Sequence, residues 1–181
     1  DEQARLFHVD YSLEGLGDGM NGGVIVADIK MDDLELGWKK AVSVWKTFKD
    51  DNPLYYWMAN STYGNDEEII VLASSEYASG KVRAQLNSLV YDKVNEYTAL
   101  TDEKDNAYRK ALAFHDKILD TIDYAYDDYG FAKMDAWAHN VLGVFEEKGG
   151  VCESYARTFQ LLLNYNGIEN LMVTGVGNGE R

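Results

Sequence analysis

The segment from residue 149 to residue 167 constrains the fold more than any other part of the sequence. A pair of glycines comes directly before a pattern in which large apolar side chains recur every three or four residues, and an Asn-Gly pair ends that pattern. The spacing predicts a helix over about residues 151–165. Cys152, the only cysteine in the sequence, lies in the first turn of this helix. A single cysteine excludes an intrachain disulfide, so no disulfide framework holds the fold.

Cys152 has two interpretations at this position. Unpaired backbone N–H groups and the positive end of the helix dipole favour a thiolate over a thiol, which makes the side chain a candidate nucleophile. The alternative is a buried structural thiol, because free cysteine is among the most buried residue types. The spacing alone leaves both interpretations open.

The residues around Cys152 read Gly-Val-Cys-Glu-Ser-Tyr-Ala. This segment resembles the nucleophile segment of the transglutaminase-like superfamily, a group of papain-like cysteine enzymes. Two further segments are similar to bacterial members: residues 113–124, which carry a His-Asp pair, and the Asn-Pro-aromatic segment at residues 52–57. The resemblance implies an α+β fold in which the cysteine helix packs on an antiparallel sheet, and it implies a strand over residues 171–176.

The resemblance also implies a chemistry. Cys152 attacks an amide carbonyl and a thioester forms. Water as the acceptor gives a protease or amidase, and an amine as the acceptor gives a transglutaminase-like transferase. Hydrolysis of peptide-like or cell-wall substrates is the favoured outcome. The alternative is a catalytically inactive binding or scaffold domain of a cell-surface protein.

The general base of the family is expected beyond the end of this sequence. Family members carry a catalytic histidine, and then an aspartate, after the strand that follows the cysteine helix, and the sequence ends at Arg181, about where that histidine would begin. Three glycines within five residues precede Arg181 and predict an exposed loop. We therefore expect a trypsin-like cut at Arg181 and a C-terminal fragment that carries the base as a partner.

Three histidines are present and are weighed as substitutes for that base. His115 falls on an apolar face of its predicted helix and is expected to be a core histidine. His139 lies thirteen residues before Cys152 and reaches it only if the intervening loop folds back. His8, in the N-terminal stretch, is expected to lie far from the site.

Four other side chains near Cys152 are candidate site residues. Trp137 and Asn140 come before the cysteine helix, and either is a candidate second oxyanion donor beside the Cys152 backbone N–H, with packing and capping as the alternatives. Tyr155 is predicted to line the site or to pack on the helix face. Glu153 is a first-turn carboxylate that complements the helix dipole.

Charge and composition limit the partners. Seventeen basic against 31 acidic side chains give a net charge of -14, which disfavours nucleic acid because its backbone is anionic. No apolar run approaches the roughly 20 residues that cross a membrane. The acidic cluster of Asp120, Asp123, Asp127 and Asp128 lacks the residue order of a calcium loop, and no metal-ligand spacing surrounds the cysteine, so neither metal nor cofactor is predicted. Acidic, tyrosine-rich and cysteine-poor composition is similar to secreted or cell-wall proteins of Gram-positive bacteria, and an extracellular location is expected.

The rest of the sequence predicts short strands that alternate with helices. We place a domain boundary at about residue 100, between an N-terminal α+β extension (residues 1–100) and the first half of the transglutaminase-like core (residues 101–181). The predicted elements are strands at residues 6–13, 24–29 and 68–73, a glycine-rich turn at 15–23, helices at about 34–48, 82–97 and 108–122, a polar loop at 98–106 and a short helical segment at 135–147.

Overall fold

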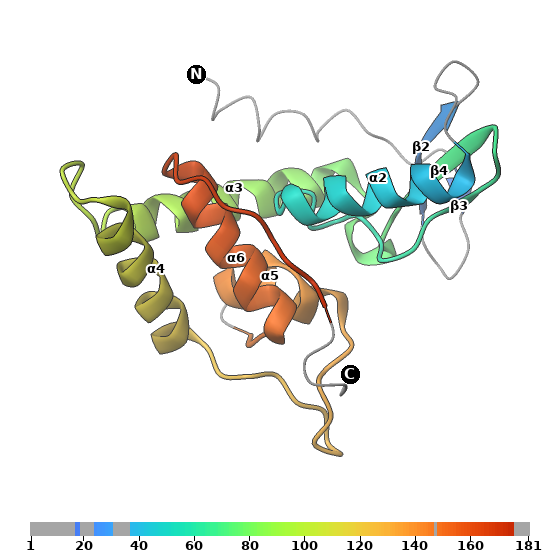
Figure 1. Ribbon diagram of the computed structural model, residues 1–181. Coiled ribbons are helices and arrows are strands. Elements are labelled where there is room, and N and C mark those ends of the chain that lie inside the picture. Colours follow the sequence, from blue (N-terminus) through green and yellow to red (C-terminus); the bar gives the residue numbers. More distant parts are fainter. Residues whose placement is uncertain (1–16, 19–23, 31–36, 147, 176–181) are drawn as a thin grey trace.

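The protein has an α+β fold, with a small antiparallel sheet at one end and most of the helices at the other (Figure 1). The computed structural model describes residues 17–18, 24–30, 37–146 and 148–175. In chain order the described elements are β1 (Gly17–Asp18), β2 (Val24–Lys30), α2 (Trp38–Asp51), β3 (Tyr63–Gly64), β4 (Glu68–Ala73), η2 (Ser75–Tyr77), α3 (Gly80–Thr98), α4 (Ala107–Thr121), η3 (Ala136–His139), α5 (Val141–Phe145) and α6 (Cys152–Tyr165).

The sheet has the strand order β1-β2-β4-β3, and every pair of neighbours is antiparallel. β4 is a continuous apolar run, and five of its six residues are buried, which is typical of a strand covered on both faces. α2 packs against this strand, where Ala41 meets Ile69 between the partly buried rings of Trp38 and Trp45. This packing fixes α2 beside the sheet and directs its C-terminal end toward the helical layer (Figure 1).

α6 lies within the helical layer and contacts α3, α4, α5 and η3. Its side chains Leu161, Leu162 and Leu163 are buried in the main apolar cluster, which they share with Val94 of α3 and Phe114 of α4. This cluster includes side chains from before and after residue 100. The domain boundary expected at about that residue stays a prediction. The arrangement holds α6 firmly, because seven of its fourteen residues are buried.

Most of the predicted elements are confirmed. The strand at 68–73 has the predicted bounds, and the predicted cysteine helix is α6. The helix predicted over 34–48 is α2, and it ends before the Asn-Pro pair. The predicted first strand, at residues 6–13, lies outside the described residues. β2 pairs with β4 and with the two-residue strand β1, which lies within the segment predicted to be a glycine-rich turn.

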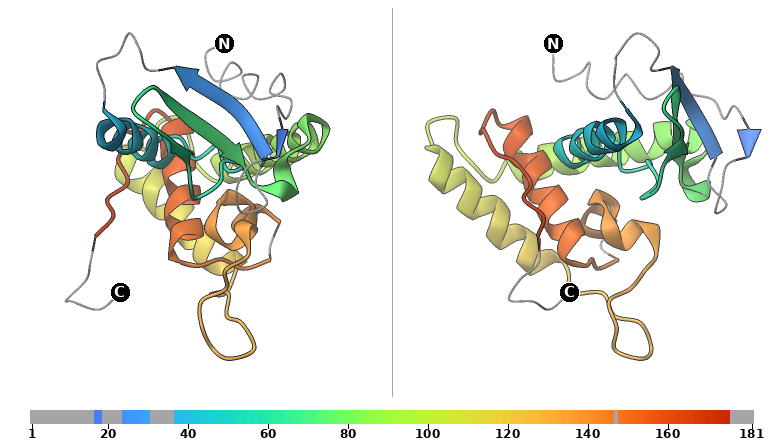
Figure 2. Two further views of the ribbon diagram at one scale, coloured as in Figure 1. Left: turned by 90° about the vertical axis from the view of Figure 1, so that its right-hand side faces the viewer. Right: turned by 45° about the vertical axis from the view of Figure 1, so that its right-hand side comes forward.

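The strand predicted over residues 171–176 is wrong for the described residues 171–175, which form neither a strand nor a helix. Leu171 and Val173 are 71% and 80% exposed. A strand requires a neighbouring strand for its hydrogen bonds, and the described sheet lies at the other end of the molecule (Figure 1). The segment instead runs back along α6 toward the first turn of that helix, as both views in Figure 2 show.

The segment predicted as one short helix at 135–147 is two elements, η3 and α5. Asn140 separates them with an extended backbone (φ -137°, ψ -178°), and its Oδ1 accepts a hydrogen bond from the backbone N–H of Leu142 at 2.8 Å. An asparagine in this conformation caps the following helix and ends the preceding one. Before η3 the chain projects from the body as a loop closed by a bridge between Tyr126 and Ala132, and it then returns to α6 (Figures 1 and 2).

In the part of the chain that the structure describes, no helix combines the length and the apolar character that crossing a membrane requires.

Candidate active site

Cys152 is the first residue of α6, and its side chain is exposed. The interpretation as a buried structural thiol is therefore wrong. Val151 occupies the N-cap position, where its apolar side chain makes no capping hydrogen bond. The first-turn N–H groups are thus left without a side-chain cap beside the thiol.

The start of α6 is held in place by several backbone contacts. The Val151 N–H donates to the Ala138 carbonyl at 2.9 Å, and the Ser154 hydroxyl donates to the Asn140 carbonyl at 2.6 Å. Gly150 allows the close approach, because a Cβ at this position would lie 2.7 Å from the Ser154 side chain. The glycine pair in the sequence therefore serves the tight packing that positions Cys152.

A groove of about 630 Å³ lies along the start of α6. One wall is the first two turns of α6, a second is the C-terminal half of α2, and the third is the segment that runs back from the end of α6. The residues that line it are Trp45, Lys46, Lys49, Asp50, Asn60, Cys152, Glu153, Ala156, Arg157, Met172, Val173, Thr174 and Gly175.

Arg157 joins two walls of this groove. Its Nε lies 2.9 Å from Oε1 of Glu153, one turn earlier in α6, and its Nη2 lies 2.9 Å from Oδ1 of Asp50 in α2. Its Nη1 donates to the backbone carbonyl of Lys49 at 2.8 Å. Arg157 is 4% exposed, and its two contacts with Lys49 and Asp50 fix α2 against the helix that carries Cys152.

His139 approaches the start of α6 because the loop before it folds back. Its Nδ1 lies 3.1 Å from Oε2 of Glu153, the residue after Cys152, and its Nε2 lies 3.0 Å from the backbone carbonyl of Lys133. Both ring nitrogens therefore face acceptors other than the Cys152 thiol. Glu153, which the sequence suggested as a partner of the helix dipole, links His139 to Arg157.

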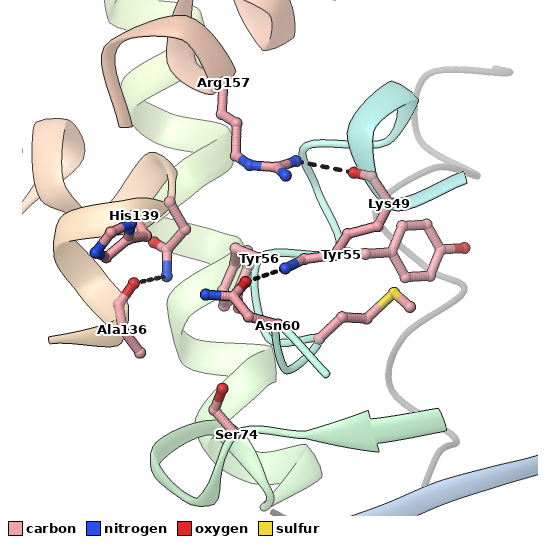
Figure 3. Close-up of a pocket in the computed structure, with 10 residues that line it drawn as sticks. Lys49, Tyr55, Tyr56, Asn60, Ser74, Ala136, His139 and Arg157 are labelled. Carbon is pink, nitrogen blue, oxygen red and sulfur yellow. Dashed lines mark hydrogen bonds between the residues drawn. The ribbon is translucent and has the colours of Figure 1, made fainter. Parts of the chain in front are cut away.

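Lys49 is a buried cation of the groove wall. It is 8% exposed, and its Nζ donates a hydrogen bond to Oδ1 of Asn60. Figure 3 shows Lys49 and Arg157 near a small enclosed cavity that His139 and Asn60 also line. Burial, and secondly the positive charge of Arg157, lower the pKa of Lys49 from 10.5 to about 8, against the opposite influence of Glu153 and Asp50.

The three predicted site-lining residues take part in packing and capping. Asn140 donates from Nδ2 to the Ala136 carbonyl at 2.8 Å and caps α5 with its Oδ1. Trp137 packs against the cluster of Ala125, Ala138 and Val151, and the Lys133 ammonium lies 5.3 Å from its ring centroid. The Tyr155 hydroxyl donates a hydrogen bond to the Ile122 carbonyl at 3.1 Å. None of the three is among the described residues that line the groove.

His115 is exposed, so its interpretation as a core histidine is wrong. α4 buries Phe114 and Ile118, and the stripe that includes His115, Tyr108 and Leu119 faces outward. Both stripes have helical spacing, and the packing of α4 against α6 determines which stripe is buried. The His115 Nδ1 lies 3.0 Å from Oδ1 of Asp116. His8 lies outside the described residues.

Sequence reasoning missed the charged residues of α2 and Arg157. The spacing of Glu153 and Arg157 by four positions is a local signal for their pairing. Nothing in the sequence pairs Arg157 with Asp50, because the two residues lie 107 positions apart. Among the described residues, no group of three or more His, Cys, Asp or Glu side chains is placed to hold a metal ion.

The comparison with protein families finds a match that includes the Cys152 segment. Residues 95–181 match the family model described as the transglutaminase-like superfamily. The matched segment runs from the end of α3 through α6 and includes Cys152, whereas α2 and the sheet precede it. No curated protein matches the sequence. Over residues 95–181, the chain is similar to the transglutaminase-like superfamily.

Proposed function

We propose that the protein is an enzyme that transfers acyl groups from amide bonds, with Cys152 as the nucleophile. The superfamily indicates cysteine-dependent acyl transfer and protease-like activity in general. The observation that carries the assignment to Cys152 is its exposed position at the start of α6, in a groove and within the matched segment. It is also the only cysteine in the sequence.

The proposed reaction has two steps. The Cys152 sulfur attacks the carbonyl carbon of the substrate amide, the C–N bond breaks, and the nitrogen leaves as an amine with the proton that the thiol has lost. The resulting thioester is then attacked by water, which releases a carboxylic acid, or by an amine, which forms a new amide. The Cys152 backbone N–H is a candidate donor to the oxyanion.

Peptide-like or cell-wall substrates and an extracellular location remain part of this proposal. Hydrolysis is the favoured fate of the thioester. Neither described histidine is proposed as the general base, because both ring nitrogens of His139 face Glu153 and Lys133, and His115 lies exposed on α4 beside Asp116.

Acyl-enzyme trapping tests the proposal. The purified protein is incubated with p-nitrophenyl acyl esters and with glutamine-containing peptides, and its mass is measured under denaturing conditions. We expect one acyl adduct, which hydroxylamine removes because thioesters are cleaved by it, and no adduct on Cys152→Ala. An adduct of equal yield on Cys152→Ala would refute Cys152 as the nucleophile. Ser43→Ala, an exposed hydroxyl on α2, is the control for nonspecific acylation.

A non-catalytic binding domain is the second candidate. The contacts of His139 favour it, because they direct the nearest described histidine away from the thiol. A binding domain would form no acyl adduct with any of these substrates, and its Cys152 would alkylate no faster than the thiol of a cysteine-containing peptide.

A further inference from the structure

The groove beside Cys152 is cationic, although the sequence as a whole has a net charge of -14. Three cationic side chains line it, Lys46, Lys49 and Arg157, against two anionic ones, Asp50 and Glu153. Arg157 forms ion pairs with both carboxylates. These three groups carry a net charge of -1, and Lys46 and protonated Lys49 on α2 bring the groove to a net charge of +1.

Lys46 and Lys49 form no ion pair with any carboxylate in the described ranges. Lys46 is exposed, and Lys49 is 8% exposed with the neutral amide oxygen of Asn60 as its hydrogen-bond acceptor. Burial of an ammonium group is unfavourable unless an anion compensates its charge. An anionic group that enters the groove would supply that compensation.

The geometry points to a groove that selects acyl donors carrying a carboxylate near the scissile amide, with Lys49 and Lys46 as the anion-binding groups. This inference rests on the proposed function of Cys152. The two lysines lie on α2, outside the segment that matches the superfamily. The preference would thus be supplied by the part of the chain that precedes the matched core. The carboxylate is either an acidic side chain or a free α-carboxylate of a peptide.

Alkylation of Cys152 by two small reagents tests the charge of the groove without any need for catalysis. Iodoacetate is anionic and iodoacetamide is neutral, and both react with the same thiolate. The ratio of their rate constants therefore cancels the thiolate fraction and reports the charge near the sulfur. We expect a ratio above that of a cysteine peptide, and a decrease of about three-fold in Lys49→Met.

Lys39→Gln is the matched control, because Lys39 is an exposed lysine of the same helix outside the groove. It should leave the ratio unchanged, whereas Lys46→Gln should lower it. Lys49→Arg, which keeps the charge, should retain the ratio of the wild type. A ratio equal to that of the wild type in both Lys49→Met and Lys46→Gln would overturn the inference, and Lys46, being exposed, can be replaced without disturbing the core.

The pH dependence of the wild-type ratio gives a second test. The ratio should fall as the pH rises through about 8, where Lys49 loses its proton, and this fall should be absent in Lys49→Met. A ratio that stays flat from pH 7 to 9.5 would contradict the assignment to Lys49. The titratable and charged groups that face Lys49 are Asp50 and Lys46 of α2, Tyr55 and Tyr56 of the following segment, Glu153 and Arg157 of α6, and His139 of η3.

Peptide substrates then separate the two sources of the carboxylate. An amide substrate is prepared with glutamate or glutamine beside the scissile bond, and with a free or an amidated C-terminus. The peptide that carries the preferred carboxylate should have a lower KM with the wild type than its neutral counterpart. Lys49→Met should remove this difference in KM. Equal KM values for all four peptides would overturn the substrate preference. Absence of turnover together with absence of acylation would refute the proposed function itself, and the alkylation ratio would still test the cationic groove.

Discussion

The guanidinium of Arg157 pairs with the carboxylate of Asp50 at 2.9 Å, across 107 positions of the sequence. The Arg157 side chain is 5% exposed and the Asp50 side chain 18% exposed. Through this contact, and through the Lys49 carbonyl, α2 is held against the helix that carries Cys152. The cysteine groove consequently depends on residues from both halves of the sequence.

Replacement of Arg157 by leucine should lower the free energy of unfolding by about 3 kcal/mol. The substitution leaves the partly buried carboxylates of Asp50 and Glu153 without their cation, and it leaves the Lys49 carbonyl without its donor. Urea unfolding followed by tryptophan fluorescence measures the change. Arg109→Gln is the control, because Arg109 is 74% exposed and 3.7 Å from Asp105, and should cost less than about 0.5 kcal/mol. Equal stabilities of the two variants would contradict this account.

Lys49 should give the stability a specific pH dependence. Its pKa in the folded protein is about 8, below the value of 10.5 for a free lysine, so the unfolded chain binds more protons between these two values. Protonated Lys49 should therefore lower the free energy of unfolding by its full amount below pH 8. This destabilisation should decrease as the pH rises from about 8 to about 10.5.

The difference in unfolding free energy between wild type and Lys49→Met isolates this effect, because other titrating groups cancel. Relative to the variant, the wild type should gain about 2–3 kcal/mol across the window from pH 8 to 10.5. A difference that does not change with pH would show that Lys49 keeps an ordinary pKa in the folded protein.

The elements that could be predicted from the sequence are those with a strong local pattern. The apolar run of β4 and the spacing of apolar residues in α6 each define their element, because burial of those side chains permits no other local structure. The position of Cys152 in the first turn of α6 follows from the same local pattern together with the glycine pair before it, whereas its exposure did not.

The remaining features depend on contacts between distant segments. Leu171 to Val173 have an apolar pattern compatible with a strand, yet the described structure places no strand beside them to pair with. His115 lay on one of two helical stripes of α4, and only the packing of Phe114 decided which was buried. The contact of His139 with Glu153 depends on the return of a projecting loop, which no periodicity describes.

Gly143→Ala should destabilise the protein by at least about 2 kcal/mol. A Cβ at Gly143 would lie 2.5 Å from the Gly149 carbonyl oxygen and 2.7 Å from the Ser154 hydroxyl, so α5 would be forced away from the start of α6. Alkylation of Cys152 should change as well, because the same contacts position the thiol. Gly130→Ala is the control: its φ of +83° gives backbone strain of roughly 1 kcal/mol, but no atom lies within 4 Å of the added Cβ. Thermal unfolding should rank the two variants in this order, and the reverse order would contradict the packing described.

Asn140→Ala distinguishes a capping residue from an oxyanion donor. The Asn140 side chain caps α5 through Leu142 and donates to the Ala136 carbonyl, so its loss should lower the free energy of unfolding by about 2 kcal/mol. A capping role predicts that the acylation rate of the folded variant stays within about three-fold of the wild type, whereas loss of an oxyanion donor lowers such rates by roughly 100- to 1,000-fold. Tyr155→Phe, which loses the hydrogen bond to the Ile122 carbonyl, is the matched control for a structural effect near the same helix. Rates are measured by mass spectrometry at a temperature where all variants are folded, and a 100-fold decrease confined to Asn140→Ala would reassign Asn140 to the oxyanion site.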